Sequence, residues 1–392
     1  MSNSDSNNKN KRILQIIPNM EIGGAERTVI EITAFLKNTN YSSIVLTSGG
    51  KLIEDLKKLD IEVIKRQIDR KNPFSIIKNI FIFKKIFTEK KIDLVHVRSR
   101  GPAWSAILAA KILNIPVITT WHGHVNQSSW FKKKYNSIMC KGDALIANSH
   151  YTAERINKIY GIDNNSIDII PRGVDVKNFK KSNFSEEQIT NIRKEWSVTD
   201  PKKIIILLPA RLTKWKGHLI AIKAINSLKK EKFFSDIICL FAGEQKGSDR
   251  YIRELKKVIS SYSIEKKIKL IGRVENMPLA YQASDIILSP SIEPEPFGRI
   301  PIEAQASGKT IISSNGGAVK DTIKGGLKPT GFKVKPNNSE ALAKEIRLVL
   351  QMQESELSEV RKRAILNVKN NFSLESMCKK TLAVYNRLLI SK

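Results

Sequence analysis

The chain has 392 residues, enough for two or three domains of roughly 150 residues each. Hydrophobic residues make up 41% and charged residues 27%, which excludes a disordered or collagen-like chain and predicts folded domains with substantial cores. The formal net charge of +29 excludes a neutral or acidic surface and favours an anionic partner, whether nucleotide, phospholipid or nucleic acid. A composition rich in Lys, Ile and Asn throughout also explains part of this excess, so we expect no specific nucleic-acid partner.

Cysteine usage and hydropathy narrow the class of protein further. Cys140, Cys239 and Cys378 lie far apart, which argues against a disulfide framework or a thiolate zinc site and predicts a cytoplasmic protein. Lys111 and Pro116 interrupt the most apolar stretch, so no transmembrane helix is expected. Residues 1–12 are polar and rich in Asn and Ser, which predicts a disordered tail rather than a signal peptide.

Short β-branched segments alternate with helical patterns, which is typical of βαβ units around parallel sheets. We predict an N-terminal Rossmann-like domain at 13–178, with strands at 13–18, 43–47, 61–65, 92–97, 117–121, 144–148 and 167–171. A second such domain at 179–374 has predicted strands at 203–209, 237–242, 268–271, 286–289 and 310–313. Helical periodicity follows at 339–350, 354–369 and 374–390, and the last helix, in residues 375–392, is expected to pack back on the first domain. The predicted fold class is α/β with two doubly wound domains, whose ligands should lie beyond the carboxyl ends of the strands.

Gly23 and Gly24 follow the first predicted strand and open a predicted helix at 25–37. Paired glycines at such a turn let backbone N–H groups approach a phosphate, helped by the positive end of the helix. The spacing is not GxGxxG, so a nicotinamide fingerprint is absent. A tight turn that merely needs glycine is the alternative explanation.

Two cations follow the first strand of the second domain. Arg211 should leave the strand end and Lys216 should begin the next helix, so both could converge on one diphosphate. Ordinary solvated surface charge is the alternative.

Two acids flank the start of a further predicted helix that begins near Gly298. Glu295 lies in the preceding loop, and Glu303 lies inside the helix, about 12 Å along it at roughly 1.5 Å per residue. One acid could hold a ribose or sugar hydroxyl while free amides of Phe297, Gly298 and Arg299 face phosphate oxygens. The alternative is a helix-start acid at Glu295 and a buried, paired acid at Glu303.

His122 closes the predicted strand 117–121 and should lie at the carboxyl edge of the first sheet. His124 follows, but the other histidines are scattered and no carboxylate follows at ligand spacing, so no metal site is predicted. A core or turn histidine is the alternative for both.

In order along the chain, GGAER, TWHG, NSHYTAERI, PRGVD, RLTKWKGH and EPFG together resemble the GT-B glycosyltransferases of the retaining family 4 type, over nearly the whole chain. The most specific piece is the pair of acids with seven residues between them, Glu295 and Glu303. The resemblance implies two domains facing across a cleft, and a UDP- or GDP-sugar donor with no cofactor and no essential metal.

The same resemblance implies residue roles. Arg211 and Lys216 would neutralise the donor diphosphate, Glu303 would bind the ribose and Glu295 would lie by the donor sugar. His122 would contact the sugar near the reacting carbon, and the loop at Gly23 and Gly24 would line the donor and acceptor site. The implied reaction transfers a hexosyl group to an acceptor hydroxyl with retained configuration, in lipopolysaccharide or cell-surface glycan synthesis.

Two basic and apolar segments bear on the acceptor. FSIIKNIFIFKKIF, at 74–87, combines a broad apolar face with Lys78, Lys84 and Lys85, and Lys132, Lys133 and Lys134 form a second cluster. Such a helix could rest on an anionic membrane and meet a lipid-linked or glycan acceptor, which predicts a peripheral location on the inner face of the cytoplasmic membrane. The alternative is a helix that covers the sheet and carries solvated lysines.

Rival functions remain at this stage. A sugar-nucleotide epimerase or a polymerising glucosyltransferase would have the same fold. A non-catalytic protein that binds anionic lipid or nucleic acid would be supported by the net charge alone.

Overall fold

The fold is described from a computed structural model of the chain, which covers residues 11–21, 23–69, 72–123, 129–244 and 249–390. The chain divides into two compact units. The N-terminal unit comprises Met1–Arg172 with Leu374–Lys392, and the C-terminal unit comprises Gly173–Ser373. Residues 173–178, expected in the first domain, therefore belong to the second unit, because the Val174 N–H donates to the Phe372 carbonyl at 2.9 Å.

The N-terminal unit is built on a seven-stranded parallel sheet in the order β3-β2-β1-β4-β5-β6-β7. Its strands are β1 Lys11–Ile16, β2 Tyr41–Thr47, β3 Glu62–Lys65, β4 Leu94–Val97, β5 Val117–Trp121, β6 Ala144–Ala147 and β7 Ile167–Ile169. Its helices are α1 Gly24–Leu36, α2 Ile53–Lys58, α3 Pro73–Glu89, α4 Arg100–Ile112, α5 Trp130–Asn136, α6 His150–Tyr160 and α15 Leu374–Ile390.

The first strand begins earlier than the sequence predicts. Lys11 and Arg12 were expected in the disordered tail, yet they pair in parallel with Tyr41 and Ser42 of β2. The Arg12 N–H also donates to the Asp93 carboxylate at 2.8 Å. Both side chains are exposed, so these two residues have no apolar pattern that would mark them as strand. Residues 1–10 of the predicted tail lie outside the described residues.

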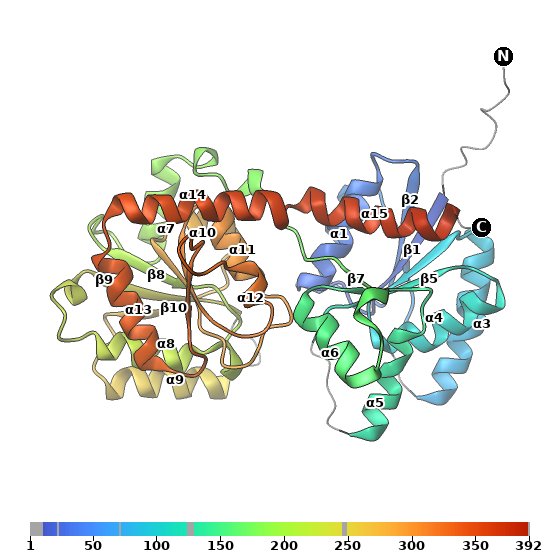
Figure 1. The fold of residues 1–392 in the computed structure, drawn as a ribbon, viewed down its shortest axis with the longest axis horizontal. Coiled ribbons are helices and arrows are strands. Elements are labelled where there is room, and N and C mark those ends of the chain that lie inside the picture. Colours follow the sequence, from blue (N-terminus) through green and yellow to red (C-terminus); the bar gives the residue numbers. More distant parts are fainter. Residues whose placement is uncertain (1–10, 22, 70–71, 124–128, 245–248, 391–392) are drawn as a thin grey trace, which may run out of the picture. The chain divides into compact units, whose positions relative to one another are not determined.

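Buried side chains cover both faces of this sheet, since successive residues of a strand point to opposite sides. In β1, Leu14 and Ile16 belong to one apolar cluster, while Ile13 belongs to another. The second cluster includes Met377 and Tyr385 of α15. The last helix, which contacts α1, is thus part of the core of the N-terminal unit (Figure 1).

The C-terminal unit has a six-stranded parallel sheet in the order β10-β9-β8-β11-β12-β13. Its strands are β8 Ile204–Leu208, β9 Ile237–Ala242, β10 Ile268–Gly272, β11 Ile286–Ser289, β12 Thr310–Ser314 and β13 Phe332–Val334. Its helices are α7 Glu186–Glu195, α8 His218–Ser227, α9 Asp249–Ser261, α10 Met277–Gln282, α11 Arg299–Ala306, α12 Val319–Thr322, α13 Ser339–Gln351 and α14 Glu354–Asn371. Strand β13 was not predicted, because it is a three-residue edge strand that only its pairing with β12 defines.

The predicted fold class of two doubly wound α/β units is confirmed. Strand order reverses between β1 and β4 in one sheet and between β8 and β11 in the other. Crevices at such reversals bind ligands in doubly wound folds. Among the helices that the structure describes, none combines the length and apolarity that a membrane span needs.

Candidate functional site

The predicted donor residues of the C-terminal unit follow the two strands at its reversal point. Arg211 and Lys216 follow β8, whereas Glu295 follows β11, and these strands are hydrogen-bonded neighbours. The two loops are joined directly, since the Ile292 N–H donates to the Trp215 carbonyl at 2.8 Å. The parallel pairing therefore gathers residues from sequence positions about eighty apart.

Lys216 and Glu295 form a nearly buried ion pair. The Lys216 Nζ lies 2.6 Å from Glu295 Oε1, and the side chains are only 12% and 7% exposed. Ser291 Oγ donates to the same carboxylate oxygen at 2.5 Å, and the ammonium lies 4.0 Å from the centre of the Trp215 ring. Lys216 was expected to begin α8. Instead it ends the 3-10 turn Lys214–Lys216, just before that helix. These contacts fix the position of both charged groups.

Gly317 allows a third loop to approach Glu295. Its φ is +62°, and a Cβ there would lie 2.1 Å from the Glu295 carbonyl oxygen. That carbonyl accepts a hydrogen bond from the Ala318 N–H at 2.9 Å. The loop after β12 thus holds the backbone of Glu295, while Lys216 in the loop after β8 holds its side chain.

Glu303 lies inside α11 and has partners of its own. Arg299 Nε donates to Glu303 Oε1 at 3.0 Å, and the Tyr281 hydroxyl donates to Glu303 Oε2 at 2.9 Å. Burial, and then the Glu303 charge, raise the pKa of Tyr281 well above its ordinary value of 10.0, which keeps the hydroxyl a donor. The pairing of Glu303, one part of the alternative interpretation, is therefore confirmed, but its side chain is half-buried rather than buried, with 17% of it exposed.

The start of α11 is shaped by Phe297 and Gly298. Phe297 is buried and packs its ring 6.3 Å from that of Phe372. Gly298 occupies the N-cap position with a φ of +72°, and no side chain caps the helix. The first N–H groups of a helix have no intrahelical partner, so this helix start can accept an oxygen ligand.

Arg211 differs from Lys216 in its surroundings. Its side chain is exposed, and among the described residues no hydrogen bond or ion pair holds its guanidinium. Of the two predicted cations, the structure therefore holds Lys216 in place and leaves the Arg211 side chain exposed.

His122 follows β5 in the N-terminal unit. Both ring nitrogens are buried and, within the described ranges, have no hydrogen-bond partner. Burial, with smaller contributions from Arg172 and Arg98, lowers the pKa of His122 well below its ordinary value of 6.5. The ring is therefore neutral at physiological pH, able to donate from one nitrogen and accept at the other. His124 lies outside the described residues.

Gly23 and Gly24 precede α1 as predicted, and the space that their missing side chains leave is already filled. A Cβ on Gly23 would lie 2.3 Å from Glu26 Oε2, and one on Gly24 would lie 2.0 Å from Arg172 Nη1. Gly24 thus admits a guanidinium to the start of α1. Arg172 lies within the PRGVD motif, but no local pattern indicates its place beside Gly24, which only the fold reveals.

A buried network at the reversal point of the first sheet was also missed. Arg98 follows β4, is 4% exposed, and donates through Nε and Nη2 to Gln15 Oε1 on β1 at 2.9 and 2.6 Å. His96 Nδ1 lies 2.7 Å from the Tyr385 hydroxyl of α15. A polar residue on a central strand, such as Gln15, was the available signal. The carboxyl ends of β4 to β7 thereby gather Arg98, His122 and Arg172 around one small cavity.

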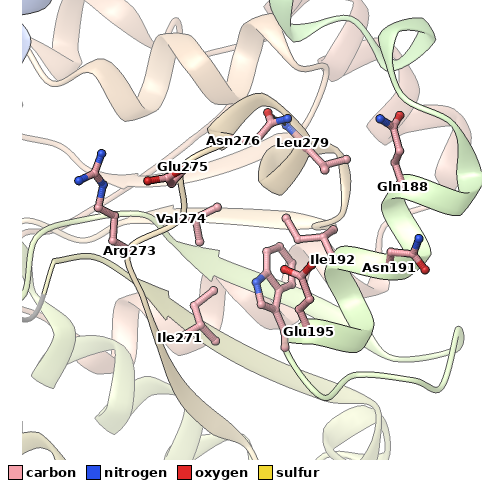
Figure 2. A pocket seen from close by; sticks show the side chains of 11 residues that line it. Gln188, Asn191, Ile192, Glu195, Ile271, Arg273, Val274, Glu275, Asn276 and Leu279 are labelled. Atoms are coloured by element: carbon pink, nitrogen blue, oxygen red, sulfur yellow. Dashed lines mark hydrogen bonds between the residues drawn. The ribbon is translucent and has the colours of Figure 1, made fainter. Parts of the chain in front are cut away.

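A larger cavity, of about 580 Å³, lies elsewhere in the C-terminal unit. Figure 2 shows Gln188, Asn191 and Glu195 of α7 on one side and Glu275 and Asn276, which follow β10, on another. None of the predicted site residues lines it. Within the ranges that the structure describes, no group of three or more His, Cys, Asp or Glu residues is arranged to hold a metal ion.

Two family models together match most of the chain. Residues 22–178 match Glycosyltransferase Family 4, and residues 189–370 match Glycosyl transferases group 1. A glycosyltransferase from Rickettsia africae is 37% identical, with a TM-score of 0.89 over 97% of this chain and 99% of that one. The fold and these matches together define the class of protein: it is a glycosyltransferase with the GT-B fold. The chain belongs to the group 1 glycosyl transferases.

More distant proteins extend the comparison. The structure of Anabaena HepE in complex with UDP-glucose is 20% identical, with a TM-score of 0.81 over 96% of this chain and 99% of that one, and shows the same fold. The lipopolysaccharide core biosynthesis mannosyltransferase LpsB of Rhizobium meliloti is 24% identical over 297 residues, 75% of this chain and 79% of that protein. Matches to several D-inositol 3-phosphate glycosyltransferases span only 41% to 57% of the length of those proteins.

Proposed function

We propose that this glycosyltransferase moves a hexosyl group from a nucleoside-diphosphate sugar to an acceptor hydroxyl with retained configuration and without a metal ion. The observation that carries the proposal is the fixed Lys216–Glu295 pair beside the exposed Arg211, where β8 and β11 end. An ammonium group has three N–H donors, and Glu295 uses one of them. Lys216 can therefore hold Glu295 and a phosphate oxygen at the same time.

In the proposed reaction, the bond between the anomeric carbon and the β-phosphate oxygen breaks, and negative charge grows on the departing diphosphate. Arg211, Lys216 and the amides at the start of α11 would stabilise that charge, an interaction that strengthens in the transition state. A bond from the acceptor oxygen to the anomeric carbon forms on the same face, and the acceptor proton passes to the leaving phosphate. No protein base is then required.

The remaining residues would position the sugar and the ribose. In this proposal Glu295, the loop at Gly23 and Gly24, and the neutral ring of His122 would contact hydroxyl groups of the donor sugar. Glu303 would bind the ribose while Arg299 and Tyr281 orient its carboxylate. The similarity to HepE, whose structure contains UDP-glucose, supports a UDP-sugar donor. The similarity to LpsB, a lipopolysaccharide core biosynthesis mannosyltransferase, supports a lipopolysaccharide or cell-surface glycan acceptor.

The test is a transfer assay with a panel of UDP- and GDP-sugars and lipid-linked or lipopolysaccharide acceptors. We expect nucleotide release that depends on the acceptor and persists in the presence of a chelator. The anomeric configuration of the product, determined by NMR, should match that of the donor sugar. An epimerised donor without acceptor would show an epimerase instead. Inverted linkage would reject the same-face path, and loss of activity with chelator would reject metal independence.

A further inference from the structure

We propose that α3, α4 and α5 of the N-terminal unit form a surface that docks on an anionic phospholipid bilayer. The contact surface consists of five exposed apolar side chains, Phe74, Ile77, Phe81, Trp130 and Phe131, and we call it the α3–α5 apolar face. Its part in delivering a lipid-linked acceptor rests on the proposed function, but the binding itself does not.

Helix α3 is apolar on two sides. One side packs into the core through Phe83 and Phe87, which are 0% and 1% exposed. The other presents Phe74, Ile77 and Phe81, which are 87%, 56% and 67% exposed. Spacings of three, four and seven residues place these three side chains on one helical face. The alternative interpretation, a helix that covers the sheet, therefore holds for one side of α3 only.

Helix α5 adds two exposed aromatic residues. Trp130 and Phe131 are 64% and 78% exposed, and their rings pack edge to face with centroids 5.1 Å apart. Tryptophan and phenylalanine on exposed helix ends suit the interfacial region of a bilayer, where an apolar ring meets polar headgroups.

Helix α4 brings the two helices together. The Trp104 Nε1–H donates to the Tyr135 carbonyl of α5 at 3.0 Å, and the adjacent Ser105 Oγ donates to the Ile76 carbonyl of α3 at 2.9 Å. Adjacent residues of α4 thus bind the backbones of both α3 and α5. Both helices belong to the same compact unit and are tied to adjacent residues of α4, and we take their exposed aromatic side chains together as one docking surface.

The charge of these helices selects an anionic occupant. Within α3, α4 and α5 the only acid is Glu89, which lies 3.7 Å from Lys85. Lys78, Lys85 and the run Lys132, Lys133 and Lys134 are exposed beside the aromatic side chains. Lysines near an anionic leaflet strengthen binding, and exposed aromatic residues contribute the apolar part. A second copy of the chain would place like charges against one another.

The test measures binding of the full chain to vesicles by flotation, without donor or acceptor. Phosphatidylcholine vesicles are compared with vesicles that contain about one-third phosphatidylglycerol. We expect binding to the anionic vesicles that weakens with salt, and binding at least about 10-fold weaker to the neutral ones. The double variants Phe74→Ser with Phe81→Ser, and Trp130→Ser with Phe131→Ser, should each lose at least about 10-fold.

The matched control is Leu348→Ser with Leu366→Ser, which removes two exposed leucines, 45% and 55% exposed, from the C-terminal unit. It should bind like the original chain, and all variants should keep their melting temperature because every altered side chain is exposed. Equal binding by both aromatic variants and the original chain would overturn the proposal. So would a dimer in sedimentation velocity that both aromatic variants dissociate. Failure of sugar transfer alone would leave vesicle binding unchanged and would count only against the proposed function.

Discussion

At the scale of single residues, the candidate site of the C-terminal unit contains two ion pairs that are already formed. Lys216 holds Glu295, and Arg299 holds Glu303, each across a short and largely desolvated contact. Removing one partner of such a pair leaves an uncompensated charge, which costs far more than the pair contributes. The fixed Lys216 and the exposed Arg211 should therefore respond differently to the same truncation.

We expect Arg211→Ala and Lys216→Ala each to lower kcat/KM by roughly 100-fold or more, because in the proposed reaction each removes a charge that stabilises the leaving group. Lys214→Ala, in the same loop and paired at the surface with Glu254, is the matched control and should keep near-native activity. Initial rates of nucleotide release measure the effect. Near-native rates in both Arg211→Ala and Lys216→Ala would remove the diphosphate role.

Stability separates the two cations. Arg211→Ala should leave the free energy of unfolding unchanged, while Lys216→Ala should lower it by about 3–5 kcal/mol, because the Glu295 carboxylate loses its partner. Adding Glu295→Gln to Lys216→Ala should restore much of this loss without restoring activity. Urea unfolding of the three variants checks the prediction, and an unchanged Lys216→Ala would contradict it.

At the scale of elements, close backbone approach arranges the loops at the carboxyl edge of the second sheet. Gly317→Ala should destabilise the loop after β12, because its φ of +62° disfavours a side chain and the new Cβ would overlap the Glu295 carbonyl. We expect a loss of about 2–3 kcal/mol and a marked rise in donor KM. Gly326→Ala has a similar φ of +74° but nothing within 4 Å of its Cβ, so it measures the backbone cost alone. Equal losses in the two variants would show that the approach to Glu295 is unimportant.

The C-terminal helix α15 is an element of the N-terminal unit. Tyr385 is fully buried among Ile13, Ile32 and Leu36, and its hydroxyl lies against His96. Tyr385→Ala should lower the free energy of unfolding by about 3–5 kcal/mol, and Tyr385→Phe by about 1–3 kcal/mol, because the second loses only the hydrogen bond. Ile390→Ala, 79% exposed on the same helix, should change little. Thermal unfolding ranks the three, and equal melting temperatures would contradict the packing described.

At the scale of the whole molecule, buried neutral histidines link stability to pH in both units. Burial lowers the pKa of His96 and His122 well below 6.5, and lowers that of His218 to about 4. Each histidine takes up a proton near pH 6.5 when unfolded but resists it when folded. The contribution of each histidine to the free energy of unfolding is therefore fully present above about pH 6.5. As the pH falls from there toward the lowered pKa of the folded protein, this contribution decreases by about 1.4 kcal/mol per pH unit for each histidine.

The pH prediction is testable with single substitutions. The free energy of unfolding should fall between about pH 7 and pH 5, and His218→Gln should flatten that decline. His150→Gln, which alters an exposed histidine, should leave the slope unchanged. Urea unfolding over this pH range measures both variants, and an unaltered slope in His218→Gln would show that His218 does not contribute.

The sequence by itself determined the fold class and most strand positions, because hydrophobic period and turn residues are local signals that short segments carry in full. The family followed from the resemblance of its ordered motifs, such as TWHG, RLTKWKGH and EPFG. The sequence placed Arg211 and Glu295 in the loops that follow β8 and β11, and Glu303 inside α11, whereas Lys216, which was expected to begin α8, ends the 3-10 turn before it. The pairing of Lys216 with Glu295 was decided by the tertiary structure, since only the parallel alignment of β8 with β11 brings residues from two loops within 2.6 Å. The same holds for β13, for Arg172 beside Gly24, and for Tyr385 against His96, 289 residues away, because no local pattern encodes a contact between distant segments.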